Sequence, residues 1–131
     1  MKVRYATDED YPLFAKWWKA HGWEPVHPAM LSPQGIVVTE DGGKPLCVGW
    51  FIKTDTKTAL FEWSVKDPEV KGKLGGEALD MLFWVLKDLA KEAGYKLFVA
   101  FAENERFIKR LVEVHGAQVG DRAMTTIIGK L

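Results

Sequence analysis

A strand-forming run, a glycine- and lysine-rich loop and a long apolar helix follow one another over residues 62–93. The run ends at Val65, and apolar periodicity predicts a helix over about residues 76–93. Lys71 and Lys73 precede that helix. Backbone N–H groups of a glycine loop and the positive end of a helix dipole both favour an anion. The order of these elements therefore predicts a phosphate-binding turn.

The composition is that of a globular protein, with 131 residues of which 47% are hydrophobic. This length suits one domain, and we expect a single domain over residues 1–131. Lys and Arg together number 18, as do Asp and Glu, which gives a formal net charge of zero. The balance argues against a nucleic-acid binder that works through a broad basic face.

Cys47 is the only cysteine, so the chain has neither an intrachain disulfide nor a cysteine-based metal cluster. No pair of histidines has a metal-ligand spacing, and we expect no metal. The first ten residues carry no apolar signal region. The longest uncharged apolar run, residues 81–86, is too short to cross a bilayer. We therefore expect a cytoplasmic protein without a membrane partner.

Strand and turn patterns predict a three-stranded meander in the first half of the chain. Its strands cover residues 35–39, 46–53 and 58–65, joined by turns at 41–43 and 55–57. A short strand at 2–6 and a helix capped by Thr7 and ended by Gly22 come before it. A proline-rich segment, residues 23–34, leaves room for one short helix at 29–31.

The second half begins with the apolar helix, on which Asp80, Lys87 and Lys91 mark a solvent-facing stripe that also holds Trp84. A strand at 96–102, a helix capped by Asn104, and strands at 117–119 and 123–129 follow. The predicted fold is α+β, in three layers. It has a mixed, mostly antiparallel sheet of six to seven strands with helices on both faces.

The position of the glycine loop excludes two nucleotide-binding patterns. A Rossmann unit places its glycine loop after the first strand of a βαβ series, whereas this loop follows the fourth strand. A Walker loop requires Gly-x-x-x-x-Gly-Lys-Ser/Thr, which is absent.

The sequence Lys73-Leu74-Gly75-Gly76-Glu77-Ala78 resembles the hallmark loop of the GNAT acetyltransferase superfamily, Gln/Arg-x-x-Gly-x-Gly/Ala. It departs from that pattern only at Lys73. The element order is similar to that of the family over nearly the whole chain. Asn104, followed after an amphipathic helix by Gly116, also resembles a family segment.

The resemblance implies acetyl-CoA or another acyl-CoA as co-substrate, with its pyrophosphate on backbone N–H groups of residues 72–78. The pantetheine arm would pass between residues 64–66 and 98–102, where the fourth and fifth strands separate. Alternatively, the glycines only form a tight helix entry and the lysines are solvated. The implied cofactor-binding residues are Ser64, Val65, Lys66, Lys71, Gly72, Lys73, Leu74, Gly75, Gly76, Glu77, Ala78 and Asn104.

Glu62 is the best candidate for a general base, because acyl transfer requires a neutral amine. Strict alternation places Leu60, Glu62 and Ser64 on one face of the strand, opposite a core face with Trp63 and Val65. The alternative is a surface or ion-paired glutamate.

Other polar and aromatic residues around the expected acceptor site leave alternatives open. His21 and His27 flank the proline-rich segment and are weaker candidates for base or acceptor contact, whereas His115 is expected at a helix end or in the core. Four tryptophans could line the acceptor entrance or belong to the core: Trp17, Trp18, Trp23 and Trp50.

The family often uses a tyrosine in the last helix to protonate the departing thiolate, but the matching positions here are Leu111 or Val112. The resemblance thus implies an N-acyltransferase acting by direct transfer on a small-molecule or protein amine, without an evident general acid. The alternative is a non-catalytic CoA-binding or protein-interaction module on the same fold. A homodimer through Trp84 or the closing strands is a further possibility.

Overall fold

The computed structural model describes residues 1–131, which divide into two compact units, Met1–Phe101 and Ala102–Leu131. The first unit contains one five-stranded sheet with the strand order β1-β2-β3-β4-β5. Neighbouring strands are antiparallel except for β4 and β5, which are parallel. The strands are β1 (Lys2–Tyr5), β2 (Gly35–Thr39), β3 (Pro45–Ile52), β4 (Thr58–Lys66) and β5 (Leu97–Ala100).

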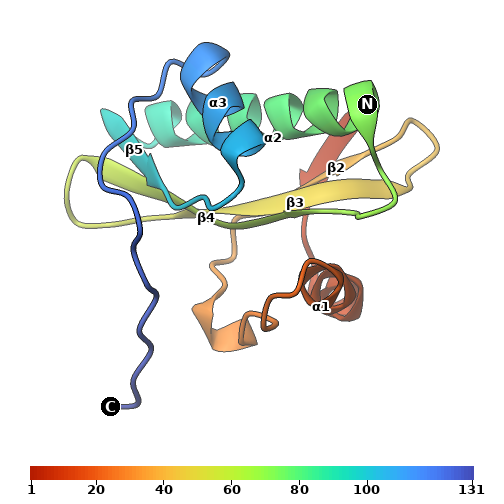
Figure 1. The fold of residues 1–131 in the computed structure, drawn as a ribbon, viewed down its shortest axis with the longest axis horizontal. Helices are drawn as coiled ribbons and strands as arrows, with labels where there is room; N and C mark the ends of the chain where they lie inside the picture. Colours follow the sequence, from red (N-terminus) through yellow and green to blue (C-terminus); the bar gives the residue numbers. More distant parts are fainter. The chain divides into compact units, whose positions relative to one another are not determined.

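Helices α1 (Tyr11–Ala20) and α2 (Gly72–Glu92) lie on opposite faces of this sheet (Figure 1). Two short 3-10 helices, η1 (Asp8–Asp10) and η2 (Pro28–Met30), flank α1 in the sequence. The prediction of a mixed, mostly antiparallel sheet with helices on both faces is confirmed. The meander and its hairpin turns are also confirmed.

A cluster of large aromatic and aliphatic side chains fills the layer between α1 and the sheet. Trp18 stacks on Trp50 with ring centroids 5.8 Å apart, and Phe14 meets Trp50 edge-on at 5.7 Å. Trp17, Trp18 and Trp50 are at most 3% exposed, so they belong to the core. We call this set the α1-side cluster; its buried members are Phe14, Trp17, Trp18, Val26, Val37, Val48, Trp50 and Val65.

The other face of the sheet packs against α2. Phe61 of β4 contacts Phe83 of α2 edge-on at 5.9 Å and stacks on Phe98 of β5 at 4.9 Å. Asp80 is only 6% exposed, so its assignment to the solvent-facing stripe was wrong, whereas Trp84 is 48% exposed. Asp80 lies one helical turn before the buried residue Phe83, so it borders the buried face of α2.

Helix α2 begins at Gly72 rather than at the predicted residue 76. Each glycine inside a helix costs about 1 kcal/mol relative to alanine, which led us to expect a loop. The long buried face of α2 offsets that cost, because tertiary packing supplies most helical stability in proteins.

In the second unit, Asn104 caps helix α3 (Glu105–Glu113) by accepting a hydrogen bond from the Phe107 N–H at 3.1 Å. Residues 117–131 contain no strand, so the predicted strands at 117–119 and 123–129, and with them a sheet of six to seven strands, were wrong. Ile127 and Ile128 are 90% and 68% exposed. β-propensity describes how side chains fit a half-buried sheet, and it cannot by itself supply a pairing partner.

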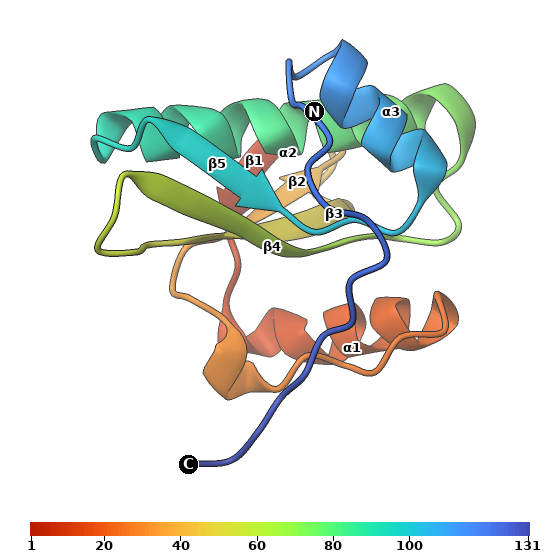
Figure 2. The ribbon, with the colours of Figure 1, turned by 60° about the vertical axis from the view of Figure 1, so that its left-hand side comes forward.

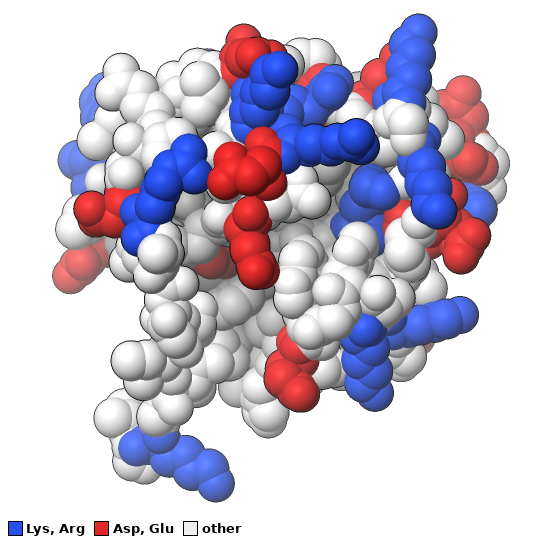
Figure 3. Space-filling view, viewed as in Figure 1, with Lys and Arg blue, Asp and Glu red and all other residues white.

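None of the helices has the length and apolar character required to span a bilayer. On the face seen in Figure 3, basic and acidic side chains are interspersed.

Candidate functional site

Strand β4 contains a bulge opposite Gly49 of β3. The register pairs Trp50 with Glu62 and Val48 with Val65, so both Trp63 and Ser64 lie opposite Gly49. Trp63 has a φ of 61°, in the left-handed region that side chains other than glycine rarely adopt. The extra residue changes the direction of every side chain that follows it.

The bulge places the side chains of Glu62 and Ser64, which regular alternation predicts on one face, on opposite faces of the sheet. Glu62 lies opposite Trp50 and therefore on the α1 side of the sheet, the same side as Val65, so the prediction that Glu62 and Val65 lie on opposite faces was wrong. Trp63 packs against the α1-side cluster as well. Ser64 instead points to the α2 side, where its Oγ lies beside Gly49 and Leu82. The prediction that Glu62 and Ser64 share a face was wrong, because it assumed a regular strand.

The pairing of β4 with β5 ends where this bulge begins. The parallel register covers only Thr58 to Phe61 of β4, whereas the pairing with β3 continues to Lys66 (Figure 2). Residues 62–66 therefore have β3 on one edge and no strand on the other within the first unit. An unpaired strand edge offers backbone donors and acceptors to a ligand.

Glu62 is a buried carboxyl group in apolar surroundings. Its residue is 8% exposed, and its Oε1 has no hydrogen-bond partner. Burial raises the pKa of Glu62 from 4.5 to about 7, because the charged form loses hydration. A carboxyl group with a pKa near neutrality suits proton transfer at ordinary pH. The alternative of an ion-paired surface glutamate is wrong.

The two bulge residues and Glu62 before them each carry a buried polar atom without a hydrogen-bond partner: Glu62 Oε1, Trp63 Nε1 and Ser64 Oγ. Native proteins pair most such atoms, so three in succession need an explanation. The packing of Trp63 against the α1-side cluster agrees with its expected place on a core face, but the bulge itself was not predicted. The one signal for the bulge is Gly49 on the neighbouring strand, since glycine in a strand often marks a bulge.

The N-terminus of α2 follows β4 after five residues of connector, 67–71. Lys71 at the N-cap makes no side-chain capping bond, and Gly72 adopts a φ of +63°. The N–H groups of the first turn, Gly72 to Leu74, have no acceptor within the helix. The N–H groups of Gly76 to Ala78 lie after the first turn, where backbone N–H groups donate within the helix. Fewer N–H groups are therefore available to an anion than we predicted.

Gly75 permits a close approach between this helix and the connector. A Cβ there would lie 3.0 Å from the Val70 carbonyl oxygen and 3.2 Å from Cδ of Lys66. The Lys66 ammonium donates to the Val70 and Asp67 carbonyls. Burial lowers the pKa of Lys66, with Asp67 opposing the effect. Lys66 thus holds the connector against β4.

Lys71 and Lys73, at the start of α2, are exposed and make few interactions with the protein. Lys73 is paired with Glu77 at 3.7 Å, yet its side chain is 89% exposed. An exposed pair of this kind contributes little to stability. Both Lys71 and Lys73 are therefore available to an anionic ligand.

The histidines near α1 have structural partners. His21 Nε2 lies 2.9 Å from the Lys66 carbonyl oxygen, and its ring stacks on Trp23 at 4.9 Å. His27 Nδ1 accepts from the Ala29 N–H and so caps η2. His115 is 6% exposed, which confirms the expectation of a buried helix-end residue. None of the three replaces Glu62 as the candidate base.

No tyrosine hydroxyl lies at the position in α3 where the resemblance would place a general acid. Tyr11 donates to the Val26 carbonyl at 2.8 Å, and Tyr95 donates to the Thr54 carbonyl at 2.7 Å. Leu111 and Val112 occupy the matching positions of α3. In this unit, Asn104 uses its side-chain oxygen to cap α3.

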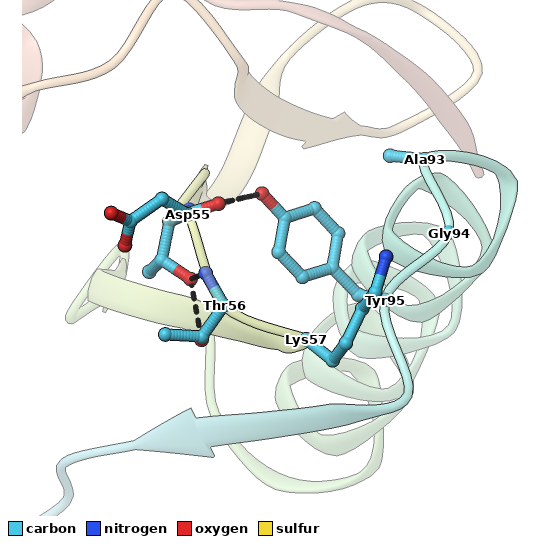
Figure 4. A pocket seen from close by; sticks show the side chains of 7 residues that line it. Asp55, Thr56, Lys57, Ala93, Gly94 and Tyr95 are labelled. Atoms are coloured by element: carbon cyan, nitrogen blue, oxygen red, sulfur yellow. Dashed lines mark hydrogen bonds between the residues drawn. The ribbon is translucent and has the colours of Figure 1, made fainter.

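A separate shallow pocket of about 210 Å³ lies at the opposite end of β4, between the β3–β4 turn and the C-terminal end of α2 (Figure 4). Tyr95 reaches across it, and its hydroxyl both donates to and accepts from the Thr54 backbone. The pocket lies at the start of β4, whereas the bulge lies at its end.

No family model matches this sequence. No curated protein matches it either. Solved structures do match. A protein from Thermus thermophilus, TTHA1254, is 16% identical over all of both chains with a TM-score of 0.69. An acetyltransferase from Trypanosoma brucei is 15% identical over 97% of this chain and 99% of its own, with a TM-score of 0.66.

N-acetylglutamate synthase from Neisseria gonorrhoeae, solved with coenzyme A and N-acetyl-glutamate, matches with a TM-score of 0.67 at 18% identity. The match covers 83% of this chain but 27% of the synthase. These identities are low, and the likeness concerns the course of the backbone. The chain has a GNAT-like fold, with a sheet of five strands.

Proposed function

We propose that this protein is an N-acyltransferase that moves an acetyl or similar acyl group from an acyl-CoA to an amine. The observation that carries the proposal is Glu62, a buried carboxyl with a near-neutral pKa at the point where β4 leaves β5. The GNAT-like fold supports the choice of reaction. The coenzyme A complex of the Neisseria synthase supports the choice of donor.

The first turn of α2 is the proposed phosphate site. Its free N–H groups and the helix dipole favour the pyrophosphate of CoA, and Lys71 and Lys73 add charge. We assign the unpaired edge of residues 64–66 to the pantetheine arm. Ser64, Val65 and Lys66 remain candidates in this role. Leu74 to Ala78 remain candidates for the pyrophosphate, and Asn104 remains a candidate cofactor-binding residue.

In the proposed reaction, ionised Glu62 removes a proton from the ammonium group of the acceptor. The amine nitrogen then forms a bond to the thioester carbonyl carbon and releases its second proton to water. The carbonyl re-forms as the C–S bond breaks, which gives the amide. A thiol has an ordinary pKa of about 8.5, so sulfur can leave as the thiolate and take its proton from water. This route needs no tyrosine in α3.

Binding is tested by thermal shift with acetyl-CoA and with CoA. A ligand present at about 100 times its Kd should stabilise the fold by about 2.7 kcal/mol. The double variant Lys71→Glu/Lys73→Glu should weaken binding by about tenfold or more, because each phosphate contact of this kind is charge-assisted. The matched control, Lys44→Glu/Lys53→Glu, has the same charge change on other exposed lysines and should bind normally.

Transfer is tested by thiol release from acetyl-CoA with a panel of amines. Glu62→Gln should lower turnover by about 10² to 10⁴, the range for loss of a general base. Equal turnover in the variant would remove Glu62 from this role. The second candidate function, a non-catalytic CoA-binding module, is favoured by the apolar Leu111 and Val112. It predicts binding without thiol release for any amine.

A further inference from the structure

We infer that the indole N–H of Trp63 donates a hydrogen bond to the acceptor substrate, and that this substrate is an amine with a neutral oxygen acceptor near its nitrogen. Amino alcohols and α-amino amides belong to this class. The inference rests on the proposed function, which it extends from the reaction to the choice of acceptor.

Trp63 Nε1 is buried and has no hydrogen-bond partner in the protein. By contrast, the neighbouring Trp18 uses its own Nε1 to donate to the Trp63 carbonyl at 3.3 Å. A buried donor without an acceptor is costly, and a ligand oxygen would satisfy it.

Trp63 adopts a φ of 61°, a left-handed conformation that is strained for any residue other than glycine. The bulge that imposes it directs Glu62 and Trp63 to the same side of the sheet. Strain that brings a proton acceptor and a donor together on one face is typical of a binding site.

Glu62 and Trp63 require different hydrogen-bonding groups from one ligand. Glu62 Oε1 requires a donor, which the ammonium group of the acceptor supplies, and Trp63 requires an oxygen. Trp63 packs against the apolar and aromatic α1-side cluster, and burial is the one cause of the raised pKa of Glu62, with no contribution from a nearby cation. Lys66, the nearest lysine along the strand, is engaged with two backbone carbonyls. A carboxylate on the acceptor substrate would place a second negative charge beside Glu62, with no cation to balance it. The substrate oxygen that accepts from Trp63 is therefore neutral.

The test compares glycinamide with n-propylamine, an amine of similar size that lacks the oxygen. In wild-type protein labelled with ¹⁵N-tryptophan, glycinamide should shift the Trp63 indole signal downfield, and n-propylamine should leave it in place. Sequential backbone assignment or loss of the signal in Trp63→Phe identifies it. No shift with glycinamide, or equal shifts with both amines, would overturn the inference.

Kinetics give the second readout. Trp63→Phe keeps an aromatic ring and should raise the KM for glycinamide about tenfold, with kcat and the KM for n-propylamine little changed. The matched control Trp84→Phe removes an indole N–H from the exposed side of α2 and should leave both KM values unchanged. A glycinamide KM that is the same in wild type and Trp63→Phe would count against the inference.

The two proposals fail separately. Acetyl-CoA that stabilises the protein while glycinamide leaves the Trp63 signal unmoved overturns the acceptor inference alone. If acetyl-CoA does not bind, the proposed function fails. The amine titration of the free protein still decides whether Trp63 recognises the oxygen.

Discussion

A Cβ atom on Gly49 of β3 would lie 2.6 Å from the hydroxyl oxygen of Ser64 on β4. This close approach follows from the bulge, which places Ser64 on the α2 side, directly against the backbone of β3. Leu82 of α2 closes the same space, since its nearer methyl carbon would lie 3.1 Å from that Cβ. A glycine at position 49 and the bulge in β4 therefore depend on each other.

Gly49→Ala is expected to destabilise the fold by about 1–3 kcal/mol, because the added methyl group overpacks this contact. The unfolding midpoint in urea measures the effect. Gly42→Ala is the control, since a Cβ there meets nothing within 4 Å. If both variants unfold at the wild-type urea concentration, the packing of Ser64 against Gly49 is wrong.

The sequence predicted the meander well because its signals are local. Asp41-Gly42-Gly43 specifies a tight hairpin, and Gly43 does adopt a φ of +94°. The bulge could not be predicted in the same way, since alternation holds only while a strand stays regular. One extra residue at Trp63 was enough to separate Ser64 from Glu62 and to bring Trp63 to the same side as Glu62.

The prediction of an anion site before α2 also rests on local signals. The glycines and lysines before α2 indicated an anion site, and the uncapped helix start agrees with that expectation. The position of the first free N–H groups depends on where the helix begins, which the packing of α2 decides. Whether β-branched residues at 123–129 form a strand depends on a pairing edge, and the sequence of that segment contains no information about one.

Lys66→Met should destabilise the protein by about 1–2 kcal/mol, because the ammonium group is the donor to the Val70 carbonyl. Methionine keeps the apolar contact of the stem near Gly75 but cannot donate. Chemical denaturation measures the loss, and proteolysis of the connector 67–71 should become faster. Lys44→Met, on the exposed β2–β3 turn, is the control. Equal protection of the connector in both variants would show that Lys66 does not hold it.

Tyr95→Phe should cost about 1–2 kcal/mol of unfolding free energy, because the hydroxyl satisfies both the N–H and the carbonyl of Thr54. The affinity for acetyl-CoA should stay unchanged, since the pocket around Tyr95 lies at the far end of β4 from the bulge. Tyr5→Phe removes a hydroxyl from a side chain on an exposed strand and should cost little. A large loss of CoA affinity in Tyr95→Phe would contradict the separation of the two sites.

The pKa of Glu62 makes the stability of the fold depend on pH. Burial raises this pKa from 4.5 to about 7, so between these values the folded protein keeps a proton that the unfolded chain has lost. The free energy of unfolding therefore falls as the pH rises through this window. Relative to Glu62→Gln, which cannot ionise, the wild type should lose about 1–2 kcal/mol of unfolding free energy between about pH 5 and about pH 8.

Urea denaturation of both proteins at each pH measures the difference. Glu77→Gln is the control, because Glu77 belongs to an exposed ion pair. Parallel pH profiles for wild type and Glu62→Gln would mean that Glu62 ionises normally, and its suitability as a base at neutral pH would then be lost.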